Sequence, residues 1–212
     1  MIKKMLPLLF MTHSLFAQQN SLTLNYDGFF DRMDDLSAAE YRDIKLAFYL
    51  VDPEGQPCEV SSANLTTKLN SKEVYVLNDG ELLLPFDEKL DQNKAAIEIN
   101  YLGNKTCGLN MRLESSILMS SKYTIEQLSS LVKTFSLALD DLGGMLSFLL
   151  PTVTGLTFEA TNKQTLSFLN QELSDRCNQQ NKCTITIKQI MALNSELILN
   201  TSPFKIVPFI NK

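Results

Sequence analysis

The chain has no tryptophan and only one histidine, His13, among its 212 residues. His13 lies in the opening segment MIKKMLPLLFMTHSLFA, which combines two lysines, an apolar run from Met5 to Phe16 and a small residue at Ala17. This order of basic, apolar and small residues is typical of a secretory signal peptide. We therefore expect cleavage near Ala17 and a mature chain without histidine; a retained membrane anchor is the alternative.

The lack of histidine excludes much common catalytic chemistry from a mature chain. Hydrolases that activate serine or cysteine with histidine are excluded, and so are histidine-based zinc centres. The sequence contains no HExxH motif and no glycine-rich phosphate loop. Ser130 and Lys133 match the S-x-x-K start of a serine–lysine acyl-enzyme motif, but the companion S-D-N and K-T-G motifs are missing. We predict no catalytic residue, no cofactor and no metal site.

Carboxylates are the remaining catalytic resource. They gather in residues 31–43 and 87–91. A glycosidase holds two carboxyl groups about 5–10 Å apart across a sugar, so Asp34 and Asp87 are the candidates for a carboxylate-based hydrolase of an envelope glycan. A solvated acidic surface is the simpler interpretation. The turns at 52–55 and 78–81 also carry oxygen ligands, but the spacing of an EF-hand calcium loop is absent.

Basic residues are few and scattered. Without Lys3 and Lys4, the 19 basic residues fall to 17 against 24 acidic ones, so the mature net charge is −7. The four arginines stand far apart, at positions 32, 42, 112 and 176. Nucleic acids and anionic membranes attract clustered cations, so we expect neither as a partner. With 44% hydrophobic and 20% charged residues, the composition is that of a globular protein.

Four cysteines, an even number, suit an exported chain with disulfide bonds. Three pairings are possible. We favour Cys58 with Cys107 and Cys177 with Cys183, because each pair falls within one apparent structural unit. Metal-binding cysteines usually come in closely spaced C-x-x-C pairs, and that spacing is absent.

Short strands separated by turns dominate residues 21–118. Alternating or aromatic-rich stretches such as SLTLNY, KLAFYLV and KAAIEINY are typical of strands. Their number and spacing predict an antiparallel sandwich or a barrel-like domain. Between the first two strands, residues 27–44 form either a helix, with Phe30, Met33 and Tyr41 facing inward, or a long ordered loop.

A long amphipathic helix is predicted over residues 123–150. Its apolar positions recur at helical spacing: Leu128, Val132, Phe135, Leu139, Leu142, Leu146 and Leu149. Thr124 and Gln127 form a candidate capping box, and Pro151 ends the run. A core helix packed on a sheet is one interpretation. The heptad spacing also suits an interface with a partner, for which the candidate residues are Leu128, Phe135, Leu139 and Leu142.

The remaining residues mix strands and helix. We predict strands in TGLTFEA, CTITIKQI and SELILN and a short helix in TLSFLNQELSDR. Pro203 and Pro208 make the last stretch an edge strand or an extended tail. The predicted fold is therefore α+β, with an antiparallel β-sandwich-like N-terminal part, a long amphipathic helix and a small mixed C-terminal part. The divisions are a signal peptide at 1–17, a β-rich part at 18–118 and an α+β part at 119–212, packed together as one unit.

Four stretches resemble a family of small exported bacterial proteins whose domain has no assigned function. They are YDGFFDRMDDL, KLAFYLVDPEGQPCEV, GELLLPFDEKL and SPFKIVPFI. The resemblance implies an export signal, a cysteine in the PCEV strand and a closing proline-containing segment, but no activity. We expect a periplasmic or extracellular, non-catalytic binding module. Its partner would be an envelope protein or a second copy of the chain, with no membrane segment after cleavage. The alternatives are the glycan hydrolase and a carrier of lipid or another small ligand.

Overall fold

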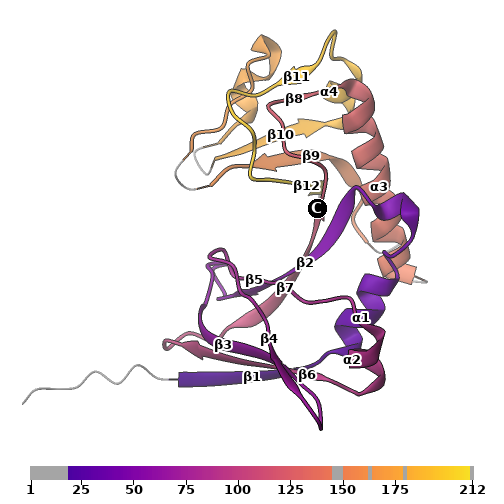
Figure 1. Cartoon of the computed structure of the whole chain (residues 1–212). Helices are drawn as coiled ribbons and strands as arrows, with labels where there is room; N and C mark the ends of the chain where they lie inside the picture. The colour runs from indigo at the N-terminus through magenta and orange to yellow at the C-terminus, as the bar shows by residue number, and fades with distance from the viewer. Residues whose placement is uncertain (1–18, 145–149, 162–163, 179–180, 211–212) are drawn as a thin grey trace, which may run out of the picture.

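The computed structural model describes residues 19–144, 150–161, 164–178 and 181–210 (Figure 1). The fold is α+β, as predicted, with antiparallel sheets and one long helix. Figure 1 shows two parts, one below the other, with the long helix along one side. The predicted signal peptide, including His13, lies outside the described residues.

Two antiparallel sheets form the N-terminal part. Their strand orders are β1-β6-β3-β4 and β5-β2-β7. The strands are β1 (Gln19–Asn25), β2 (Ile44–Val51), β3 (Glu59–Thr66), β4 (Ser71–Glu73), β5 (Glu81–Leu82), β6 (Ala96–Leu102) and β7 (Gly108–Ser115). In β6 the side chains alternate between core and surface: Ile97 and Ile99 are buried whereas Glu98 is exposed. This is the alternation of a two-sheet sandwich.

Residues 74–77 carry the chain from one sheet to the other. The N–H of Val74 donates to Ala63 in β3, whereas the N–H of Leu77 donates to Glu81 in β5. Gly80 lies in the turn between Leu77 and Glu81 and has a φ of +86°. A side-chain carbon at this position would lie 2.8 Å from the carbonyl oxygen of Leu50. Only glycine fits both constraints. The stretch GELLLPF, which the sequence offered as a strand, contains only the two-residue strand β5. Pro85 has no N–H with which to continue the strand pairing.

The helices α1 (Asp27–Asp34) and α2 (Glu88–Gln92) cover one end of the sandwich, and the 3-10 turn η1 (Ala39–Tyr41) leads into β2 (Figure 1). Residues 27–44 thus form a short helix and a turn, where the sequence left helix and loop open. Phe29 packs edge-on against Phe48 with ring centroids 4.9 Å apart.

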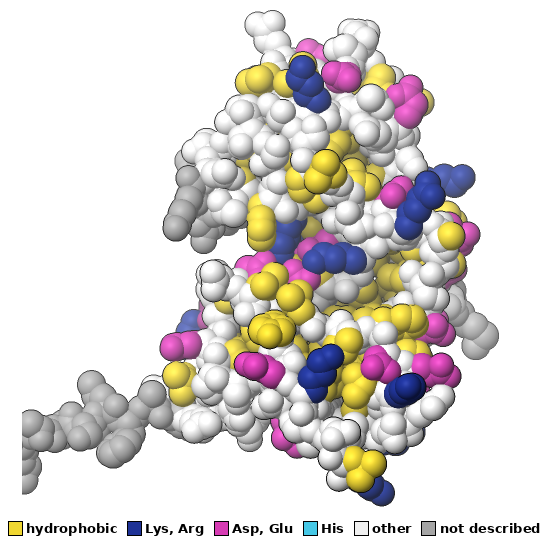
Figure 2. Space-filling view, viewed as in Figure 1, with side chains coloured by type: hydrophobic (Ala, Val, Ile, Leu, Met, Phe, Trp, Pro, Cys, Tyr) yellow, Lys and Arg dark blue, Asp and Glu magenta, His cyan; other side chains and the backbone are white. Residues whose placement is uncertain are grey.

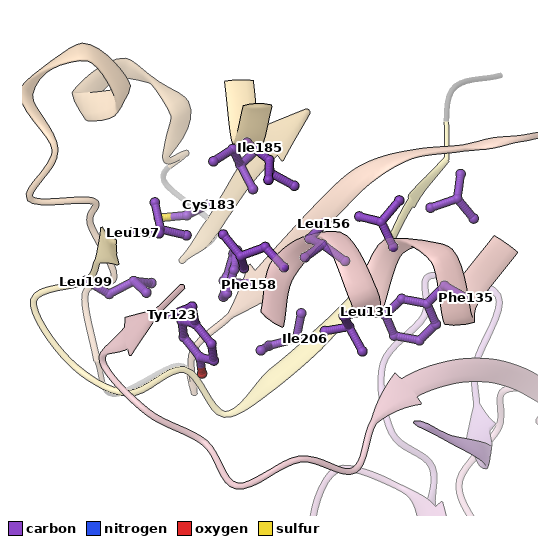
Figure 3. Close-up of a cluster of buried hydrophobic side chains, with 14 of the residues drawn as sticks. Tyr123, Leu131, Phe135, Leu156, Phe158, Cys183, Ile185, Leu197, Leu199 and Ile206 are labelled. Atoms are coloured by element: carbon purple, nitrogen blue, oxygen red, sulfur yellow. The ribbon is translucent and has the colours of Figure 1, made fainter. Parts of the chain in front are cut away.

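The C-terminal part packs the long helix α3 (Ile125–Gly143) against a sheet of order β10-β9-β12. Its other elements are β8 (Lys122–Tyr123), β9 (Val153–Glu159), η3 (Gln171–Arg176), β10 (Lys182–Thr186), α4 (Ile187–Met191), β11 (Leu197–Ile198) and β12 (Lys205–Ile210). Leu131 and Phe135 of α3 pack with Leu156 and Phe158 of β9 in the apolar core (Figure 3). This core also includes Tyr41, Ile44 and Leu113, so it extends into the N-terminal part.

Both ends of α3 follow from local sequence. The predicted capping box is present: the Thr124 side chain accepts from the N–H of Gln127, and the Gln127 side chain accepts from the N–H of Thr124. The helix ends at Gly143, before Pro151, and Gly144 follows with a φ of +50°. Residues 145–149, which the predicted helix included, lie outside the described residues.

Two predictions for the C-terminal part are wrong in detail. The predicted strand over 183–190 ends at Thr186, because the Thr186 side chain accepts from the N–H of Gln189 in a second capping box that starts α4. The predicted helix over 165–176 is a 3-10 turn at Gln171–Arg176, while Phe168 pairs with Leu199. The closing segment forms an edge strand, β12, as its prolines predicted.

Two disulfides join Cys58 to Cys107 and Cys177 to Cys183, which is the pairing that the sequence favoured. The first closes a loop of 49 residues and the second a loop of 6. Loop entropy predicts a contribution of about 4 kcal/mol from the first and about 2 kcal/mol from the second. The longer one ties β3 to the start of β7 within the N-terminal part.

Candidate functional site

The carboxylates that the sequence singled out lie at exposed positions. Asp34 is the last residue of α1. Asp87 is the N-cap of α2, and its side chain accepts from the N–H of Lys89 at 2.9 Å. A helix cap already accounts for Asp87. Neither carboxyl group has the buried surroundings that tune a catalytic acid or base.

A different set of charges gathers where the two parts meet. We call it the junction network: Lys45 and Tyr49 of β2, Asp79, Glu81 of β5, Arg112 and Glu114 of β7, Glu159 of β9, Lys182 of β10 and Lys205 of β12. Figure 2 shows side chains of both signs gathered at this level of the molecule. The network draws on six strands from separate regions of the chain, so local sequence patterns do not reveal it. The available signal is a charged residue inside an apolar strand, as in MRLES and KIVPF.

Lys205 is the centre of the network, and only 8% of it is exposed. Its Nζ lies 2.6 Å from Asp79 Oδ2, 3.6 Å from Glu114 Oε1 and 3.9 Å from Glu81 Oε2, and it donates to the Tyr49 hydroxyl. That hydroxyl donates in turn to Glu114 Oε1 at 2.6 Å. Lys205 therefore connects the C-terminal strand β12 to three strands of the N-terminal part, β2, β5 and β7, and to the turn that carries Asp79.

Arg112 and Glu159 form a second connection between the parts. Arg112 Nη2 lies 2.9 Å from Glu159 Oε2, and Lys182 Nζ lies 2.8 Å from the other oxygen, Glu159 Oε1. Burial alone would raise the pKa of Glu159, but Lys182 and Arg112 outweigh it and lower that pKa. Glu159 is thus a carboxylate with a cation on each oxygen.

The network balances its charges. Its four cations, Lys45, Arg112, Lys182 and Lys205, face four carboxylates, Asp79, Glu81, Glu114 and Glu159. Burial and the neighbouring Glu114 carboxylate raise the pKa of Tyr49, so its phenol stays protonated. The cations compensate the burial of Glu81 and Glu114, since a buried charge is costly unless it is paired.

An apolar pocket of about 380 Å³ lies beside this network, and we call it the junction pocket. Its lining comes from α1 (Arg32), β2 (Leu46), β7 (Met111, Arg112, Leu113), α3 (Leu139, Leu142) and β12 (Val207, Pro208, Ile210). β7 and β12 lie next to each other but belong to different sheets. The pocket lies where these two edge strands meet without pairing through backbone hydrogen bonds into one sheet.

The four interface candidates on α3 fall into two pairs. Leu128 and Phe135 are 1% and 0% exposed, because the first turns of α3 press against the β9 sheet (Figure 3). They therefore have no surface to offer a partner. Leu139 and Leu142 are half-buried and line the junction pocket. Of the four candidates, only Leu139 and Leu142 remain accessible to a partner or ligand.

A second hollow, of about 440 Å³, lies in the N-terminal part near β2, β4 and β5. Its lining mixes the cations Lys45 and Lys72 with the carboxylates Glu73 and Glu81. Lys45 and Glu81 already form an ion pair. This hollow therefore presents no charge of a single sign to a ligand.

Among the described side chains, no group of three or more His, Cys, Asp or Glu residues is placed to hold a metal ion. Within the same part of the chain, no helix has both the length and the apolar character to cross a bilayer.

The chain matches a known protein family over more than half of its length. Residues 18–160 match the family model described as "Protein of unknown function (DUF2987)". The matched range runs from β1 to the end of β9 and includes α3. Neither the curated proteins nor the solved structures give a significant match. Since the family model spans well over half of the sequence, the chain belongs to the DUF2987 family of proteins of unknown function.

Proposed function

We propose that the protein is a non-catalytic binding module of the cell envelope and that its ligand occupies the junction pocket. The observation that carries this proposal is the composition and place of the pocket. Eight of its ten lining residues are apolar, and they come from both parts of the molecule. Concave, mostly apolar sites with a few polar groups are the usual form of small-ligand sites.

The size of the pocket limits the ligand. Ligand pockets usually enclose about 300–1,000 Å³, so a volume of about 380 Å³ suits a small molecule or a single apolar chain. Each buried methylene of such a chain contributes about 0.8 kcal/mol to binding. A carrier of a lipid or small ligand was one of the alternatives from sequence, and the pocket is the feature that favours it.

Two further features support a binding role in the envelope. The carboxylates at the junction are paired with cations, and burial and the neighbouring Glu114 raise the pKa of Tyr49; both observations favour binding over acid–base catalysis at this site. The two disulfides suit an oxidising compartment, as does the predicted signal peptide.

Binding of a neutral, environment-sensitive dye tests the proposal. We expect N-phenyl-1-naphthylamine to fluoresce on binding to the protein purified from the envelope fraction of its expression host. Leu142→Asp puts a charge into the apolar lining and should weaken dye binding at least tenfold, since a buried unpaired charge costs several kcal/mol. Leu137→Asp is the matched control, because Leu137 is 41% exposed on the same helix and is outside the pocket lining.

Circular dichroism must show that both variants are folded. Absence of dye binding to the unchanged protein would overturn the proposal. So would equal dye affinity in the folded Leu142→Asp and Leu137→Asp variants, because the dye would then bind elsewhere.

A further inference from the structure

The charged residues of the junction pocket are of one sign. Two of the four arginines of the chain, Arg32 and Arg112, are in its lining, and no described lining residue is acidic. The protein as a whole is acidic, with 24 Asp and Glu against 19 Lys and Arg. The second hollow, by contrast, has lining residues of both signs. The junction pocket therefore departs from the charge of its surroundings.

Arg112 is already neutralised by the protein. Its guanidinium lies 2.9 Å from Glu159 and 4.0 Å from Glu114, and it stands 5.7 Å from the centre of the Tyr49 ring. Burial opposes its charge, but these carboxylates outweigh burial and raise the pKa of Arg112. Arg112 thus lines the pocket as a polar side chain whose charge is already balanced by the carboxylates of Glu159 and Glu114.

Arg32 differs from Arg112 in its exposure and in its lack of a charged partner. It is exposed on the last turn of α1, and among the described residues it has neither an ion-pair nor a hydrogen-bond partner. A guanidinium offers a planar fork of N–H donors that matches the two oxygens of a carboxylate. Arg32 is therefore the cation at this pocket whose charge is not used within the described structure.

Acidic neighbours of Arg32 in the sequence act against an anion. Asp31 and Asp34 are on the same helix and Asp35 is its C-cap, but none of them lines the pocket, and no ion pair joins Arg32 to them. Their effect is a screened repulsion through water, whereas a head group at Arg32 makes direct hydrogen bonds. One arginine among acidic neighbours suits a single negative charge better than the double charge of a phosphate monoester.

We infer that the junction pocket binds a single-chain amphiphile with a carboxylate head, a free long-chain carboxylic acid. The apolar chain lies against Leu139, Leu142 and Val207, and the carboxylate pairs with Arg32. This inference rests on the proposed function, because it names the ligand class of the same pocket. The volume of about 380 Å³ excludes a lipid with two long chains from full enclosure.

Displacement of the neutral dye by four ligands of equal chain length tests the inference. The ligands are dodecanoate, dodecanol, dodecyl phosphate and dodecyltrimethylammonium, each below its micelle concentration. We expect dodecanoate to bind about five- to tenfold more tightly than dodecanol, as a charge-assisted hydrogen bond allows. Arg32→Gln should abolish this preference, and Arg32→Glu should reverse it in favour of dodecyltrimethylammonium.

Arg42→Gln is the matched control, because Arg42 is an exposed arginine outside the pocket lining, 3.8 Å from Asp43. It should keep the preference for dodecanoate. Raising the salt concentration should reduce the preference in the unchanged protein, since an exposed pair is screened.

The other outcomes separate the two proposals. Equal displacement by dodecanoate and dodecanol overturns the head-group inference but leaves dye binding, and with it the proposed function, intact. Tighter binding of dodecyl phosphate overturns the choice of carboxylate, and tighter binding of the cationic ligand shows that the aspartates of α1 dominate. A protein that does not bind the dye contradicts the proposed function itself.

Discussion

The interiors of the two parts are held together by apolar packing, whereas ion pairs connect the two parts at the junction. Each part has an apolar core, such as Phe48 with Ile97 in the N-terminal part and Phe135 with Phe158 in the C-terminal part. The junction instead buries the charged side chains of Lys205, Glu81 and Glu114 within a wider network of ion pairs. Apolar packing tolerates many arrangements of similar volume, whereas an ion network is satisfied only in one. The difference indicates that the junction specifies how the two parts meet and so shapes the pocket between them.

Removal of the central cation should have the largest effect. Lys205→Met keeps the length of the side chain but leaves Asp79, Glu114 and Tyr49 without their buried partner. We expect a loss of about 3–5 kcal/mol in the free energy of unfolding, measured by urea denaturation. Lys188→Met, at an exposed position of α4, should change stability by less than about 0.5 kcal/mol. Similar urea midpoints for the two variants would show that the network is not structural.

Two leucines of α3 compare the apolar interior with the pocket. Leu131 is 3% exposed in the core, whereas Leu139 is half-buried at the junction pocket. Leu131→Ala should cost about 2–5 kcal/mol, because it leaves a cavity in packed surroundings. Leu139→Ala should cost less than half as much in the same assay and should weaken dye binding instead. If Leu139→Ala is the more destabilising of the two, the pocket lining is part of the core.

Acid should weaken the junction before it affects the interiors. Burial alone would raise the pKa of Asp79, but Lys205 outweighs it and lowers that pKa, and Lys182 and Arg112 likewise lower the pKa of Glu159 against its burial. Below their unfolded pKa values of about 4, the unfolded chain binds more protons than the native one, so stability falls as pH drops.

Urea midpoints between pH 7 and pH 3 measure this smaller effect. Stability should change little above pH 5 and decline below about pH 4.5, as the unfolded carboxyls take up protons. Glu159→Gln removes one of the two carboxyls and should flatten the decline. A decline of the same steepness in Glu159→Gln would assign the acid sensitivity to other carboxyl groups.

Local patterns predicted the elements whose causes are local. Alternating or aromatic-rich stretches predicted β1, β2 and β6, and the reciprocal hydrogen bonds of Thr124 and Gln127 start α3 where the capping pattern indicated. The same pattern occurs at Thr186 and Gln189, but there it lies inside the stretch CTITIKQI, whose β-branched residues favour a strand, so the sequence did not predict α4. Proline at Pro203 and Pro208 correctly indicated the sheet edge.

The sequence predicted some of the residues of the candidate site but not the way they come together, because that depends on tertiary contacts. The heptad spacing singled out Leu139 and Leu142 but could not separate them from Leu128 and Phe135, which face the sheet. Burial of Glu81, Glu114 and Lys205 depends on strands that are far apart in the sequence. The aspartates that the sequence offered as catalytic candidates cluster along the chain, and clustering along the chain does not place them together in a buried site.

The position of Lys205 also bears on the order in which the molecule assembles. Its partner Asp79 stands 126 residues earlier, and Tyr49 stands 156 residues earlier. Contacts between such distant residues require the closure of a long loop, which costs conformational entropy before the contact stabilises the fold. A chain synthesised from its N-terminus therefore presents Glu81 and Glu114 before their buried cation exists. The strand that carries Lys205 is the last described element to emerge, and its docking completes the union of the two parts.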